Sequence, residues 1–156
     1  MEIFERQELL IFLDVFIASL LTMLVGVERE KASKAAGIRT NMIVGGFTCL
    51  MVSLIDPLIG MATVDHADQI VRSDPIRVLQ AIVVGVSFIG AGTIIKSTEK
   101  SRVTGLTTAA TLLYSIGIGM SVAVKSYLLA VLLTLFILLI NRVLKYLMER
   151  FTDLKD

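Results

Sequence analysis

The residues best suited to chemistry lie in one polar segment, 26–41, which separates two strongly apolar runs. The segment reads GVEREKASKAAGIRTN and holds six of the chain's 15 basic and 14 acidic residues. Its polar residues next to the two apolar runs are Glu28, Arg29, Glu30, Arg39, Thr40 and Asn41. Charges at the edge of a membrane usually pair with one another or mark an ion site. Because Arg29 and Arg39 can neutralise the glutamates, we favour an ion-pair hairpin over a cation-responsive site.

Asp14 is a second candidate, because it lies within the first apolar run, about five residues from its outer end. Asp14 and Glu28 are fourteen residues apart, close to four helical turns, and would share one face of a helix. One hypothesis is a cation-responsive polar region formed by Asp14, Glu28 and Glu30 with hydroxyls of a neighbouring helix. The alternative is that Asp14 reaches the outer interface or pairs with another helix.

Hydroxyl residues recur along the fourth apolar run, at Thr104, Thr108, Thr111 and Ser115. Intervals of four, three and four residues place them on one face of a helix, within roughly 60° of one another. Such a face would either line a polar cavity or bond to neighbouring helices. We favour the packing role, because hydroxyls also bond to carbonyls of their own helix and then need no water.

A membrane-embedded fold is needed to position these residues. Hydrophobic residues make up 55% of the 156-residue chain, the mean hydropathy is +0.82, and tryptophan is absent. The apolar runs are continuous and longer than the roughly ten residues of a barrel strand, so we predict an all-α bundle. The acidic N-terminus does not predict a cleaved signal peptide. A net charge of +1 gives no indication of nucleic-acid binding.

Five transmembrane helices are predicted, which form a single domain over 1–156. They span about residues 9–27, 40–62, 78–95, 103–124 and 127–147. Lys and Arg residues divide eleven to four between alternate sides of these helices. Since basic residues favour the cytoplasmic side, we predict an external N-terminus and a cytoplasmic C-terminus.

No motif in the sequence predicts an enzyme. The segment GAGTIIKS lacks the glycine before lysine that a phosphate-binding loop needs. The single histidine, His66, is expected on the opposite side of the membrane from the charged segment. That outer stretch also contains four carboxylates, Asp56, Asp65, Asp68 and Asp74. These would attract a divalent cation, although a solvated acidic loop is the commoner explanation.

Small residues recur where helices are expected to approach closely. Gly45, Cys49 and Ser53 follow one another at intervals of four, a spacing that favours helix contacts. The third apolar run adds Gly85, Gly90 and Gly92, and Gly105 lies near the start of the fourth. We predict helix packing at these glycines. We also predict a homodimer, because one five-helix bundle has no obvious need for both small-residue faces.

Three segments together resemble the MgtC/SapB family of bacterial membrane proteins: GVEREKASKAAGIRTN, DPIRVLQAIVVGVSFIGAGTI and VTGLTTAATLLYSIGIG. The resemblance covers about residues 9–124 and implies a five-helix protein of the inner membrane with an external N-terminus. The matching positions are Glu28, Arg29, Ala36, Gly37, Arg39, Thr40, Gly85, Phe88, Gly90, Ala91, Gly92, Gly105, Leu106, Thr107, Thr108, Ala109 and Ala110. Ser87 and Leu113 depart from the family pattern, which has glycine and tryptophan there. The family's usual cytoplasmic C-terminal domain is not expected in this chain.

The resemblance implies a role in magnesium or cation homeostasis, in adaptation to low magnesium and in virulence. We expect no cofactor, apart from a contact with Mg²⁺. The expected partners are the lipid bilayer, a second copy of the chain and another membrane protein, with no nucleic acid. The alternative is a regulatory protein that modulates another membrane complex, for example an ATP synthase or a transporter, and transports nothing itself.

Overall fold

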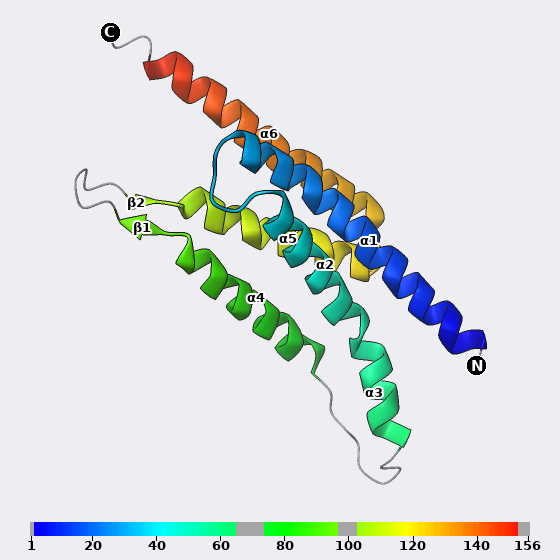
Figure 1. Ribbon diagram of the computed structural model, residues 1–156. Helices are drawn as coiled ribbons and strands as arrows, with labels where there is room; N and C mark the ends of the chain where they lie inside the picture. The colour runs from blue at the N-terminus through cyan, green and yellow to red at the C-terminus, as the bar shows by residue number, and fades with distance from the viewer. Residues whose placement is uncertain (1, 65–73, 97–102, 153–156) are drawn as a thin grey trace.

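The computed structural model describes residues 2–64, 74–96 and 103–152, which are mostly helical (Figure 1). The elements are α1 (Glu2–Lys31), α2 (Ile38–Ser53), α3 (Ile55–Val64), α4 (Pro75–Gly92), β1 (Ile95–Lys96), β2 (Val103–Thr104), α5 (Leu106–Ala123) and α6 (Tyr127–Thr152). Four stretches are long and apolar enough to cross a membrane: Arg6–Lys31, Ile38–Gly60, Pro75–Gly92 and Leu106–Ala123. The apolar part of α6, Tyr127–Val143, provides the fifth helix. The predicted all-α bundle of five membrane helices is confirmed.

Local sequence signals set the start of two helices. The side chain of Asp74 accepts a hydrogen bond from the Ile76 amide at 3.1 Å, and Pro75 fits the first helical position, so α4 begins there. Gly105 has a φ of 90°, and a side chain at this position would collide with the carbonyl oxygen of Thr93. This left-handed turn separates β2 from α5.

The predicted row of four helical hydroxyls is wrong at its first position. Thr104 lies in β2 and pairs with Ile95 of β1 in a short antiparallel ladder. Because the turn at Gly105 intervenes, α5 begins after Thr104. The hydroxyl face of α5 therefore consists of Thr108, Thr111 and Ser115, all of which are buried.

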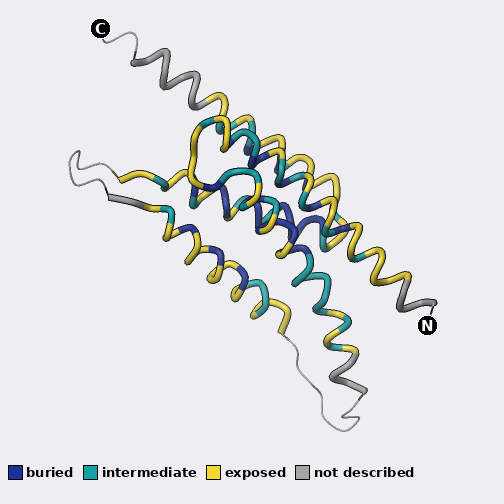
Figure 2. The backbone as a smooth tube through the Cα atoms, in the orientation of Figure 1, coloured by how far each residue is buried: buried dark blue, intermediate teal, exposed yellow. Residues whose placement is uncertain are grey.

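The core lies where α1, α2 and α5 meet, and buried positions concentrate there (Figure 2). Ala18, Cys49 and Ile118, one from each of these helices, are fully buried in a single apolar cluster. α6 packs against α1 and α5. α4 contacts α5 but buries only Ile82, Val86 and Gly90, so most of its surface is exposed.

Helices α1 and α6 run parallel, side by side (Figure 1). Tyr127 bonds to Asp14, and Asn141 bonds to Glu28, so both helices advance fourteen residues between the two contacts. The described ends of the chain accordingly lie at opposite ends of the bundle. This arrangement requires an odd number of membrane crossings. Which end faces the cytoplasm stays a prediction from the charge distribution.

Two of the predicted packing glycines lie at close helix contacts. A Cβ atom at Gly45 would collide with Thr22 of α1, and a Cβ at Gly119 would collide with the Gly45 carbonyl oxygen. A Cβ at Gly90 would lie 3.2 Å from that of Ala109. The small-residue face of α2 is therefore used within the chain, which removes it as a surface for the predicted homodimer.

Gly85 and Gly92 differ from these glycines. A Cβ atom at either position would meet no described atom within 4 Å. Both glycines are exposed, and the neighbouring Phe88 is 84% exposed. Helix α4 thus presents a face with no packing partner among the described residues.

Candidate functional site

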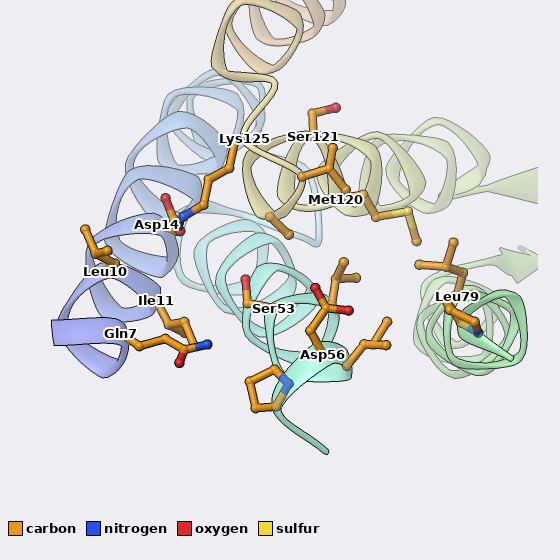
Figure 3. A pocket seen from close by; sticks show the side chains of 16 residues that line it. Gln7, Leu10, Ile11, Asp14, Ser53, Asp56, Leu79, Met120, Ser121 and Lys125 are labelled. Carbon is orange, nitrogen blue, oxygen red and sulfur yellow. Dashed lines mark hydrogen bonds and ion pairs between the residues drawn. The ribbon is translucent and has the colours of Figure 1, made fainter. Parts of the chain in front are cut away.

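The first polar site is the Asp14 cluster, formed by Asp14, Lys125 and Tyr127 (Figure 3). Asp14 is 2% exposed; its carboxylate contacts Lys125 Nζ and accepts a hydrogen bond from Tyr127 Oη at 2.7 Å. Lys125 lies in the tight turn between α5 and α6, with a φ of 61°. The hydrogen bond to Asp14 raises the pKa of Lys125. Asp14 is therefore paired with residues at the junction of two other helices. This agrees with the interpretation in which Asp14 pairs with another helix.

The second polar site is the Arg29 cluster, formed by Glu28, Arg29, Thr108 and Asn141. Arg29 is 3% exposed, and its Nη1 lies 4.0 Å from Glu28 Oε2. Arg29 Nη2 donates to Thr108 Oγ1 at 3.4 Å, whereas Nε has no hydrogen-bond partner among the described residues. Asn141 Nδ2 donates to Glu28 Oε2 at 2.8 Å. Side chains from α1, α5 and α6 thus meet around the Glu28–Arg29 pair.

Arg39 does not join this cluster, so the predicted pairing of Glu28 with Arg39 is wrong. Arg39 is exposed and makes no ion pair with the described residues. It precedes the buried Asn41 by two residues, about 200° around α2, so the two side chains point to opposite sides. The intervening Thr40 is half-buried. Glu30 is exposed and accepts a hydrogen bond from the Ile38 amide at 3.0 Å, which caps α2.

Between the two clusters lies a layer of buried polar side chains centred on Asn41. Its Nδ2 donates to the carbonyl oxygens of Ala36 and Gly37 at 3.1 and 2.9 Å, and its Oδ1 accepts from Ser115 at 2.8 Å. Thr111 donates to the carbonyl of Thr107, itself an exposed residue, at 2.8 Å. The hydroxyls of this layer therefore bond to protein groups, and most of them bond within their own helix.

The two clusters cannot act as one site. The fourteen residues of α1 between Asp14 and Glu28 separate them by about 21 Å along the helix. The polar layer between them makes internal hydrogen bonds. The hypothesis of one cation-responsive region containing Asp14, Glu28 and Glu30 therefore requires correction, because these carboxylates have separate partners.

A cavity of about 730 Å³ adjoins the Asp14 cluster, between α1, α2, α3, α4 and α5 (Figure 3). Asp14 and Lys125 line one side of it, and Ser53 and Asp56 line another. Ser53 Oγ is buried without a hydrogen-bond partner in the described part of the chain. Asp56 is exposed and forms no ion pair there. These oxygens are among the groups in the cavity that have capacity for a ligand.

A preformed metal centre is not found among the described residues. Asp65, His66 and Asp68 of the predicted acidic stretch lie outside that part of the chain. Asp74 caps α4 and forms an ion pair with Arg77 at 3.4 Å. The described residues of this stretch therefore do not assemble the cation site that was the less common of its two explanations.

Fold and sites together define a multi-pass helical membrane protein with one paired buried charge near each end of its bundle. The sequence matches the MgtC family over residues 15–150, and the chain belongs to this family. It is a multi-pass protein of the inner membrane. No solved structure matches the chain significantly.

Three bacterial relatives illustrate the match. "Protein MgtC" of Salmonella typhimurium is 34% identical over 91% of this chain and 55% of its own length. "Putative magnesium transporter YhiD" of Escherichia coli K12 is 33% identical over 83% of this chain and 58% of its length. "Protein SapB" of Bacillus subtilis is 31% identical over 83% of this chain and 54% of its length. The chain thus spans little more than half the length of these relatives.

Proposed function

We propose that this protein serves magnesium or cation homeostasis and adaptation to low magnesium, by modulating another membrane complex instead of conducting ions. Membership of the MgtC family supports a role at the membrane. The name of the E. coli relative supports magnesium as the ion. The case for modulation over conduction comes from the charges inside the bundle.

The carrying observation is that a basic side chain paired with a carboxylate lies at each end of the buried polar layer. Lys125 covers the Asp14 carboxylate at one end, and Arg29, 3% exposed, occupies the other. Two unit charges 4 Å apart interact by about 4 kcal/mol at an effective dielectric constant of 20. A divalent cation at that distance from Arg29 would therefore meet a repulsion of about 8 kcal/mol from the guanidinium, before the attraction of Glu28 is counted.

The groups between the two ends support the same proposal. A conducting path needs oxygens that are free to replace the water around an ion. Asn41 Oδ1 already accepts from Ser115, and Thr111 and Thr48 donate to carbonyls of their own helices. Hydrogen bonds thus fix the orientation of these side chains, so they are not free to turn toward a passing ion.

The role in homeostasis is tested by deleting the gene from its bacterium and measuring growth across a range of Mg²⁺ concentrations. We expect slower growth of the deletion strain at low Mg²⁺ only, with recovery when the wild-type gene or additional Mg²⁺ is supplied. Equal growth of the two strains at every Mg²⁺ concentration would refute the proposal.

A cation sensor in the cavity beside Asp14 is a second candidate. It is favoured by the Asp56 carboxylate and the unpartnered Ser53 hydroxyl, which line that cavity. If Mg²⁺ binds there, it should raise the melting temperature of the purified protein, and Asp56→Asn should abolish the increase. Glu8→Gln is the control, because Glu8 is exposed and does not line the cavity. An equal response of both variants would exclude this site.

A further inference from the structure

A second cavity, of about 330 Å³, lies between the ends of α1 and α6 next to the Arg29 cluster. Leu24 and Leu138 form part of an apolar wall, and Lys31 and Arg142 lie at its polar end. Because α1 and α6 are parallel, their basic residues reach the same end of the bundle. The cavity therefore joins an apolar surface to a pair of cations from different helices.

The two cations have spare binding capacity. Lys31 and Arg142 are exposed, and neither forms an ion pair with a described residue. The carboxylate in the same cavity, Glu28, already accepts from Asn141 at 2.8 Å and lies 4.0 Å from Arg29. The negative charge of Glu28 is thus already compensated by Arg29 and Asn141. Lys31 and Arg142 therefore leave an excess of positive charge at the mouth of the cavity.

We propose that this cavity binds one anionic phospholipid, with its phosphate between Lys31 and Arg142 and an acyl chain along Leu24 and Leu138. Arg presents a planar fork that matches a phosphate, and a lysine at a helix end extends its ammonium group to the membrane surface. Basic cavities between membrane helices are known to bind anionic lipid headgroups. Leu24 lies seven residues before Lys31, so the apolar wall extends about 10 Å from the charged end.

The test measures lipid binding to the detergent-purified protein by native mass spectrometry, with phosphatidylglycerol and phosphatidylcholine of identical acyl chains. Each basic residue near an anionic surface contributes roughly a fivefold gain in affinity. We expect the double variant Lys31→Gln/Arg142→Gln to bind phosphatidylglycerol about thirtyfold more weakly than wild type. Its affinity for phosphatidylcholine should stay unchanged.

The matched control is Lys34→Gln/Arg39→Gln, which removes two exposed charges from the same end of the bundle without altering the cavity lining. We expect it to retain wild-type affinity for phosphatidylglycerol. Equal losses in the two double variants would overturn the proposal, because the attraction would then be diffuse. Equal binding of both lipids by wild type would also overturn it.

Inorganic phosphate and Leu24→Asn distinguish a lipid from a free anion. A lipid site predicts that millimolar phosphate leaves phosphatidylglycerol bound and that Leu24→Asn weakens its binding. Displacement of the lipid by phosphate, with no effect of Leu24→Asn, would assign the cavity to a small anion instead. Unchanged melting temperatures of the variants would establish that they are folded.

Discussion

The Asp14 cluster predicts an unequal effect of removing its two charged partners. Lys125→Met leaves the Asp14 carboxylate, 2% exposed, with Tyr127 Oη as its single described hydrogen-bond donor. Breaking a buried ion pair costs about 3 to 5 kcal/mol, and we expect about 3 kcal/mol because that donor remains. Asp14→Asn instead leaves an ammonium group that is already 54% exposed and readily hydrated. This change should cost about 1 kcal/mol.

The free energy of unfolding would be measured by titrating the detergent-solubilised protein with SDS while helix content is followed by circular dichroism. The double variant Asp14→Asn/Lys125→Met should be about 2 kcal/mol more stable than Lys125→Met alone, because no buried charge is left unpaired. Lys34→Met, at an exposed loop position, is the control and should change stability by less than about 0.5 kcal/mol. Equal losses in both single variants, without recovery in the double variant, would refute the reasoning.

Three further predictions concern packing, assembly and topology. Arg29→Ala should cost about 3 kcal/mol in the same SDS titration, since it strands polar groups that the guanidinium now satisfies; a loss below 0.5 kcal/mol would contradict this. Gly45→Leu should destabilise the bundle by about 3 kcal/mol through steric overlap, whereas Gly85→Leu should preserve stability but weaken the predicted homodimer. Mass measurement in nanodiscs tests the second effect, and a wild-type monomer would exclude the dimer. In a cysteine-free background, Ser126→Cys should react with an impermeant reagent from outside and Ser33→Cys should not. The reverse pattern would show that the topology is opposite to the predicted one.

The membrane-crossing helices were predictable because long continuous apolar runs indicate their number and type, although the second run divides into α2 and α3. The partners of the candidate residues were harder to predict. Periodicity places residues on a face of one helix but does not give the rotation of one helix relative to another. Arg39 illustrates this limit, since its position on α2 turns it away from Glu28 when Asn41 faces the core.

One missed contact did leave a signal in the sequence. Asp14 is the single charged residue in 9–27, and Lys125 is the single one in 103–141. Two isolated charges of opposite sign in apolar surroundings favour a pair, and the structure brings them together. Asn141 left no comparable signal, because its contact with Glu28 depends on the parallel packing of α1 and α6.

The central claim is that the protein does not conduct Mg²⁺. It is tested most directly by measuring Mg²⁺ entry into proteoliposomes that contain the purified protein and an internal magnesium indicator. Paired charges that close both ends of the bundle predict a rate equal to that of protein-free liposomes at every Mg²⁺ concentration. A saturable rate that increases with the amount of protein, and that Glu28→Gln abolishes without unfolding the bundle, would contradict the account.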